Sequence, residues 1–138
     1  MQKLAKKKLN DFDIDFELIT EMAEEIPLKS NSIDSVVCTY TLCSISNPKL
    51  ALSEIKRVLK KDGKFIFTEH AASPNLKINK FQKKIEPLWK VIADGCHLTR
   101  DIRTMLAVNG FNVDSSNEIY LPGTPKFIGY HIWGLLKK

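Results

Sequence analysis

The sequence predicts an α/β fold in which a mostly parallel sheet is followed by an antiparallel hairpin. Two observations support this class. A strand, a capped helix and a second strand follow one another within residues 33–69, which is the pattern of a βαβ unit. Residues 118–121 and 127–136 then form two further strand candidates around the turn sequence PGTP. A length of 138 residues suits a single domain with one core.

Two strands are expected in the first third of the chain. DFELI, at residues 15–19, is a short strand candidate that ends in the polar stretch TEMAEE. IDSVVCTYT, at residues 33–41, is nearly continuous in apolar and β-branched residues, which is typical of a strand buried on both faces of a parallel sheet.

The helix between residues 48 and 61 has clear boundary signals. Asn47 is a good N-cap, Pro48 suits the first helical position, and apolar residues recur at Leu52, Ile55 and Leu59. Gly63, after Asp62, is expected to end the helix in a left-handed conformation. KFIFTE, at residues 64–69, follows at once and predicts a second buried strand.

Two more helices are predicted before the hairpin. From residue 75 onward, apolar residues recur at 3 and 4 spacing, so an amphipathic helix is expected to run to Gly95, bent or broken at Pro87. Thr99 is expected to cap the next helix, which should place Ile102, Met105 and Leu106 inward and end at Asn109 and Gly110.

Composition narrows the class of protein. The chain is 43% hydrophobic and 27% charged, which is typical of a globular protein, and it has no apolar run long enough for a membrane span or a signal peptide. We therefore expect a cytoplasmic location, no membrane span and three reduced cysteines. The net charge of +5 comes from scattered lysines without interleaved aromatic residues, so solvated helix faces are favoured over nucleic-acid binding.

Ligands of such sheets bind beyond the carboxyl ends of the strands. In this sequence that rule indicates three short stretches: 20–24, 39–44 and 69–72.

Several ordered motifs resemble those of one family. AEEIPLKSNSIDSVV at 23–37, ALSEIKRVLKKDGKFIF at 51–67 and MLAVNGF at 105–111 are similar to motifs of the class I S-adenosylmethionine-dependent methyltransferases. Within that family, VVCTYTLCSI, EHAA, PLWKVIADGCHLTRD and GYHIWGLLKK resemble the methyltransferase-like protein 7 group, which is implicated in methylating thiols. The resemblance covers almost the whole chain.

The resemblance implies a partial Rossmann-like sheet. The family's strand order is 3-2-1-4-5-7-6, and its first strand leads into a GxGxG loop that binds the cofactor. No such loop is present, since Gly63 is the first glycine, and MQKLAKKKL at 1–9 looks like the helix after the second strand. We therefore expect residues 1–138 to be one N-terminally truncated domain that lacks strands 1 and 2. The exposed edge of the 33–41 strand would favour a homo-oligomer or marginal stability.

The resemblance also implies positions that contact S-adenosylmethionine. Met22 and Ala23 stand where family members flank the adenine, although packing alone is an equally good interpretation of Met22. Thr39, Tyr40 and Thr41 match positions that line the methionine portion of the cofactor.

Catalytic candidates are weaker. His70 follows the second buried strand and could act as a general base, although a structural histidine hydrogen-bonded at the loop base is the favoured alternative. Asp94 is a second candidate, in the DGCHLTRD stretch. Cys96 and His97 lack the spacing of a metal site and an orienting third group, so no metal is predicted, and a helix-ending loop with Arg100 facing the pocket is favoured. Both tryptophans, Trp89 and Trp133, are expected in the core.

Two classes of function remain open. The first is methyl transfer from S-adenosylmethionine to a small molecule, such as a thiol or a lipid-like acceptor, impaired because the glycine loop is absent. The second is a non-catalytic remnant that serves as an interaction or dimerisation module.

Overall fold

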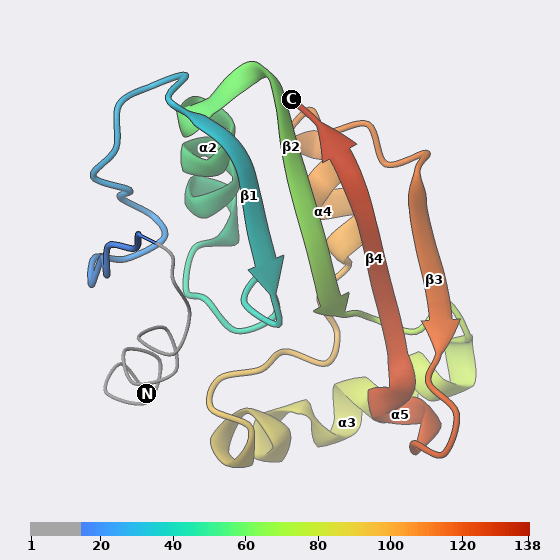
Figure 1. The fold of residues 1–138 in the computed structure, drawn as a ribbon. Coiled ribbons are helices and arrows are strands. Elements are labelled where there is room, and N and C mark those ends of the chain that lie inside the picture. Colours follow the sequence, from blue (N-terminus) through green and yellow to red (C-terminus); the bar gives the residue numbers. More distant parts are fainter. Residues whose placement is uncertain (1–14) are drawn as a thin grey trace.

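A computed structural model describes residues 15–138, so the helix expected at 1–9 lies outside the described part of the chain. The described residues form a four-stranded sheet with the order β1-β2-β4-β3 (Figure 1). The strands are β1 (Ile33–Thr39), β2 (Leu59–His70), β3 (Ser116–Tyr120) and β4 (Tyr130–Lys137). The helices are α2 (Pro48–Val58), α3 (Leu76–Ile92), α4 (Ile102–Val108) and α5 (Lys126–Gly129).

The sheet is mixed. β1 and β2 are parallel and are joined through α2, which confirms the predicted βαβ unit. β4 is antiparallel to both β2 and β3, which confirms the C-terminal hairpin, so only one of the three pairings between described strands is parallel. The order β1-β2-β4-β3 corresponds to 4-5-7-6 in the order that the family resemblance implied.

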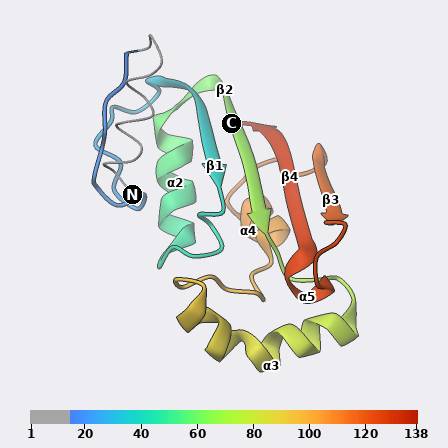
Figure 2. The same ribbon diagram turned by 60° about the horizontal axis from the view of Figure 1, so that its bottom comes forward.

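Helices α2 and α4 cover one face of this sheet (Figures 1 and 2). Alternate residues of the strands point to that face and form the core with the two helices. It includes Cys38, Phe65, Phe67, Ile132 and Leu136 from strands, and Leu52, Ile55, Ile102 and Leu106 from helices. Helix α3 lies across the end of the sheet at which β1 and β2 finish (Figure 2).

The opposite face carries an apolar row that no described helix covers. Val37 pairs with Ile66, which pairs in turn with Leu135, so the three side chains lie side by side across three strands. Val37 is 66% exposed, and the other two are also exposed. The expectation that β1 is buried on both faces is therefore wrong, because only its other face meets a helix layer.

The strand predicted at residues 15–19 is absent. Residues 15–20 have no regular secondary structure and pair with no described strand. A strand is stable only with a hydrogen-bonded neighbour, and among the described strands β1 is paired on one side only, with β2. The local composition of residues 15–19 favours a strand, but it does not show whether a neighbouring strand is available to pair with it.

Helix α2 ends earlier than its apolar stripe predicted. It stops at Val58, and Leu59 already has an extended backbone and begins β2. Gly63 does not have the expected left-handed conformation. Ile33 pairs with Leu59 but Ser35 with Lys64, so residues 60–63 bulge out of the ladder. A Cβ at Gly63 would lie 2.9 Å from the Lys60 carbonyl oxygen, and this close approach explains the glycine.

Three smaller expectations are also corrected. Asp101, not Thr99, caps α4, because its Oδ1 accepts a hydrogen bond from the Thr104 N–H at 2.9 Å. Helix α3 continues through Pro87 to Ile92. The last strand begins at Tyr130, because residues 126–129 form the short helix α5. Asn109 and Gly110 end α4 as predicted, Gly110 with a φ of 78°.

Glu54 and Arg57, two charged residues of helix α2, form hydrogen bonds that hold the segment before β1 in place. Arg57 forms an ion pair with Glu54 at 2.7 Å and donates to the carbonyl oxygens of Ile26 and Leu28. Glu54 accepts from the Ile26 N–H in return. Two charged side chains on one helix face thus satisfy backbone groups of an irregular segment.

No helix within residues 15–138 is long and apolar enough to cross a lipid bilayer.

We predict that replacing Phe65 with alanine lowers the free energy of unfolding by about 3 to 5 kcal/mol, because a fully buried ring is removed from the core. Phe65 packs against Phe67 and Phe111, with ring centroids 5.8 and 5.2 Å away. Urea unfolding would measure the loss. The matched control is Phe81→Ala on the exposed face of α3, which should cost about 1 kcal/mol or less. Equal losses would contradict the proposed core.

Candidate functional site

The candidate site lies where the parallel strands β1 and β2 end, at the edge facing α3 (Figure 1). The chain leaves β1 through Tyr40, whose φ of 50° is left-handed and uncommon for a residue with a side chain. The Tyr40 N–H still donates to the Thr68 carbonyl oxygen at 2.9 Å, so the turn begins within the ladder. The residues that follow, 40–44, are named the β1–α2 loop below.

A buried carboxylate holds the β1–α2 loop. Glu69 has no exposed surface, and its Oε1 accepts hydrogen bonds from the N–H groups of Thr41 at 2.9 Å and Leu42 at 3.0 Å. Its Oε2 accepts from the Cys43 N–H at 3.1 Å. The Cys38 thiol also donates to Oε1 at 3.4 Å. One side chain of β2 therefore satisfies three successive backbone donors of a loop that no regular element pairs.

Arg100 holds the same loop from another direction. Its Nη1 donates to the Leu42 carbonyl oxygen at 2.6 Å, and its own carbonyl oxygen accepts from the Ala72 N–H at 2.9 Å. Burial lowers the pKa of Arg100, although attraction to nearby acidic groups, including Glu69, opposes that shift. The sequence interpretation placed Arg100 facing a pocket, whereas the structure shows it bound to the loop backbone.

Three aromatic side chains lie in a row beside this loop. Tyr40 meets His131 edge-on with ring centroids 5.6 Å apart, and His131 meets His70 in the same way at 5.7 Å. Tyr40 is 52% exposed, whereas His70 is 6% exposed. Neither ring nitrogen of His70 has a hydrogen-bond partner among the described residues. The favoured alternative, a structural histidine hydrogen-bonded at the loop base, thus has no hydrogen bond to support it among residues 15–138, and both interpretations of His70 stay predictions.

The remaining predicted positions are spread out. Thr39 ends β1, and the Thr41 hydroxyl donates to the Thr39 carbonyl oxygen at 3.1 Å, which keeps both beside Tyr40. Met22 is 70% exposed in the segment before β1, next to Ala23 in a turn. Asp94 is exposed, with a φ of 47°, in the turn after α3. No hydrogen bond or ion pair within residues 15–138 joins Asp94 to His70, so their catalytic roles stay predictions.

The DGCHLTRD stretch folds into a braced turn. His97 Nδ1 lies 3.1 Å from Glu86 Oε1, and the Thr99 N–H donates to Glu86 Oε2 at 2.9 Å. Burial raises the pKa of Glu86, but the hydrogen bonds from Thr99 and His97 outweigh burial and lower it overall. His97 therefore holds the turn against α3 through its contact with Glu86. Among residues 15–138, no group of three or more potential ligands could hold a metal ion.

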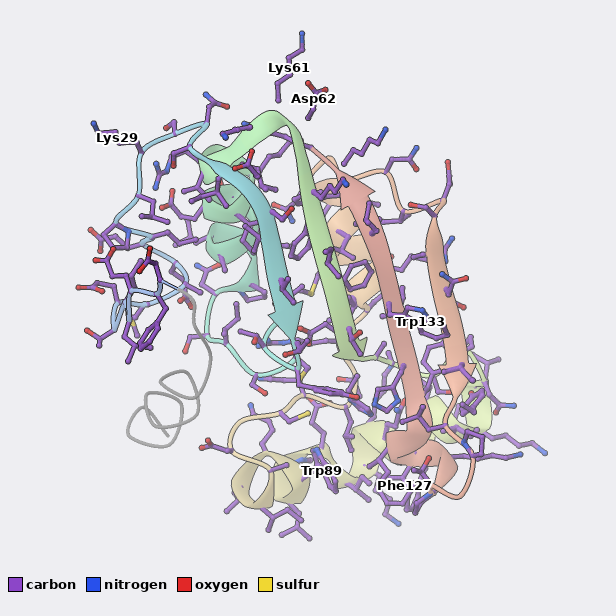
Figure 3. All side chains as sticks on the ribbon, in the orientation of Figure 1. Lys29, Lys61, Asp62, Trp89, Phe127 and Trp133 are labelled. Atoms are coloured by element: carbon purple, nitrogen blue, oxygen red, sulfur yellow. The ribbon has the colours of Figure 1, made fainter. Side chains whose placement is uncertain are left out.

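A basic hollow of about 620 Å³ lies at the opposite end of the sheet, lined by Asn31, Lys60, Lys61 and Lys138. Figure 3 shows Lys61 and Asp62 at that end, far from Trp89 and Phe127 beside α3. Lys60 is paired with Asp34, and Lys138 donates to Asn31 and the Leu59 carbonyl oxygen. These lysines bind the protein itself, so the hollow does not mark the site.

Glu69 is the functional residue that sequence reasoning missed. The strand-end rule indicated the stretch 69–72 but singled out only His70. A signal was present, because Phe65, Phe67 and Glu69 alternate along one strand and must share a face. An acid on the core face of a buried strand needs hydrogen-bond donors, which the neighbouring strand end can supply.

The strand order, the parallel βαβ unit and the loop beyond β1 define a class I S-adenosylmethionine-dependent methyltransferase fold. A crystal structure of a Bacillus halodurans methyltransferase superposes with a TM-score of 0.78, covering 99% of this chain and 78% of that one at 17% identity. That likeness concerns the fold alone.

Sequence comparison gives the family. The family described as "Methyltransferase domain" matches residues 1–67. Thiol S-methyltransferase TMT1A of Homo sapiens is 37% identical over 108 residues, covering 78% of this chain and 44% of the relative. Thiol S-methyltransferase TMT1B of Rattus norvegicus is 47% identical over 75 residues, covering 54% and 31%. The chain is thus a class I S-adenosylmethionine-dependent methyltransferase relative, close to the thiol S-methyltransferase group. It spans less than half the length of these two curated relatives.

We predict that Glu69→Gln lowers the free energy of unfolding by about 2 to 3 kcal/mol, because an amide group would turn an N–H donor toward backbone donors and leave at least one unsatisfied. Urea unfolding would measure the change. Asp62→Asn is the matched control, because it makes the same acid-to-amide change at an exposed position at the other end of β2, and it should stay within about 0.5 kcal/mol of the parent. An unchanged stability of Glu69→Gln would show that the loop does not depend on this carboxylate.

Proposed function

We propose that this chain forms the acceptor side of an S-adenosylmethionine-dependent methyltransferase site that acts on a small thiol or a lipid-like molecule. The observation that carries the proposal is the β1–α2 loop, fixed by Glu69 beyond the carboxyl ends of two parallel strands, with Tyr40 exposed and His70 unpartnered beside it. The thiol S-methyltransferase relatives support a sulfur acceptor.

The residues present suit part of the cofactor. Thr39, Tyr40 and Thr41 would contact its methionine portion, and Met22 with Ala23 would flank the adenine, since the Met22 and Tyr40 side chains are exposed. When bound, S-adenosylmethionine supplies an electrophilic methyl group on a sulfonium. The sequence contains no GxGxG loop, because its first glycine is Gly63. We therefore propose weak cofactor binding by these 138 residues.

His70 is the proposed proton acceptor. A thiol attacks as its thiolate, so a neighbouring base raises the reactive fraction. The His70 imidazole suits that role because its nitrogens are free of hydrogen bonds to the described chain. Burial and the adjacent rings of His131 and Tyr40 would exclude water and hold an apolar acceptor close to the methyl donor.

Methyl transfer to short alkyl thiols should be detectable by mass spectrometry as the thioether, with cofactor binding by calorimetry only at millimolar concentrations. His70→Asn should slow the transfer about 100-fold, as loss of a general base does. His97→Asn is the control, because this histidine already pairs with Glu86 and should leave the rate nearly unchanged. The absence of both heat and thioether at millimolar cofactor would reject the enzymatic proposal.

An interaction module is the second candidate. It is favoured by the apolar row of Val37, Ile66 and Leu135, which no described helix covers, and by the outer edge of β1, which pairs with no strand of residues 15–138. This candidate implies self-association through β1. Light scattering should then show a mass that rises with concentration, and Val37→Lys should shift it toward the monomer. Val108→Lys, an equally exposed change on α4, is the control. A monomeric parent at all concentrations would reject the module.

A further inference from the structure

Two cysteines from distant parts of the sequence meet beside His70. Cys43 belongs to the β1–α2 loop, and Cys96 lies in the turn between α3 and α4. The His97 N–H donates to the Cys43 carbonyl oxygen at 2.8 Å, so the loop and the turn are in backbone contact next to both cysteines. A disulfide needs Cα atoms within about 7 Å of each other, a range that direct backbone contact between the two segments allows.

The two thiols are unequal. Cys43 is 2% exposed, whereas Cys96 is half-buried and therefore reachable from solvent. Interaction with the Cys96 sulfur and burial raise the pKa of Cys43. The pKa of Cys96 is lowered, first by the Cys43 thiol and then by the side chains of His70 and Trp89. The directions of the two shifts favour Cys96 as the thiol that ionises more readily.

The surroundings of Cys96 carry uncommitted donors. His70 Nδ1 and Nε2 and Trp89 Nε1 are buried and have no hydrogen-bond partner among residues 15–138. Such groups cost free energy when they are buried without a partner, and both side chains lower the pKa of Cys96, which makes its sulfur their nearest candidate acceptor. Figure 3 places Trp89 on α3 below the strand ends, beside the turn that contains Cys96. The cluster thus consists of an accessible thiol, a second thiol and a free imidazole.

The third cysteine provides an internal contrast. Cys38 lies on β1, is buried in the core and donates to Glu69 at 3.4 Å. Burial, followed by the nearby Glu69 charge, raises its pKa to about 12. Cys38 should therefore be inert toward oxidants at neutral pH.

We propose that Cys96 and Cys43 form a peroxide-sensitive dithiol site, in which Cys96 is the attacking cysteine and Cys43 the resolving one. The Cys96 thiolate attacks one oxygen of hydrogen peroxide, the O–O bond breaks, hydroxide leaves and Cys96 becomes a sulfenic acid. The Cys43 sulfur then attacks the Cys96 sulfur, a disulfide forms, and the sulfenic oxygen leaves as water with the Cys43 proton. The product would fasten the β1–α2 loop to the α3–α4 turn.

The test treats the native 138-residue chain with hydrogen peroxide at neutral pH, alkylates the remaining thiols after denaturation, and maps them by mass spectrometry. We expect Cys43 and Cys96 to be lost together as one intramolecular disulfide that dithiothreitol reverses, while Cys38 remains alkylated. Disulfide formation should be at least about tenfold faster than oxidation of Cys38. Equal oxidation of all three cysteines, or disulfides only between chains, would overturn the proposal.

Variants separate the two roles. Cys43→Ser should stop at a Cys96 sulfenic acid that dimedone traps, Cys96→Ser should abolish the fast reaction, and Cys38→Ser is the matched control that should leave it unchanged. Native-state alkylation of the unmodified chain provides a readout without mutation, in which Cys96 should react first. Sulfenic acid appearing at Cys43 instead would reverse the assignment and contradict the proposal. None of these measurements depends on methyl transfer.

Discussion

The carboxylate of Glu69 is the constraint on which the candidate site depends. Beyond β1 the chain must leave the sheet, and three consecutive N–H groups lose their ladder partners there. Glu69 supplies the acceptors from the neighbouring strand, and Arg100 supplies a donor for the Leu42 carbonyl oxygen. Because these two side chains satisfy the loop backbone, the loop is held without helix or strand geometry, and Tyr40 takes a left-handed conformation at its start.

One face of the sheet is covered by helices, and the other face is exposed within the described chain. The first is covered by α2 and α4 and contains the aromatic and aliphatic core. The second presents Val37, Ile66 and Leu135 to solvent within the described chain. Val37 lies on β1, and the outer edge of β1 pairs with no described strand. Apolar surface and free backbone donors at one place favour association with further polypeptide.

The candidate reactive side chains come from segments that are far apart in the sequence. His70 comes from the end of β2, His131 from β4, Cys43 from the loop after β1, and Cys96 from the turn after α3. Helix α3 brings the last of these into place, because Gln82 on α3 hydrogen-bonds to Ser73 and Phe127 and fixes the helix across the strand ends. The methyl-transfer and thiol-oxidation proposals use neighbouring parts of this one region, which would couple them physically.

Local sequence determined the elements whose signals lie within a few residues. Asn47 and Pro48 began α2, Asn109 and Gly110 ended α4, and the alternation around Phe65 marked β2, since capping and periodicity depend on near neighbours. The family motifs gave the strand order.

Only the tertiary structure decided the rest. The strand expected at 15–19 needed a partner that β1 does not provide, and α2 stopped at Val58 because the chain enters the sheet at Leu59. The candidate site likewise depends on contacts between distant parts of the chain. Sequence placed His70 at a strand end. The hydrogen bonds of Glu69 to the loop and the contact of His97 with Cys43 join residues 26 or more positions apart, which spacing along the chain does not encode.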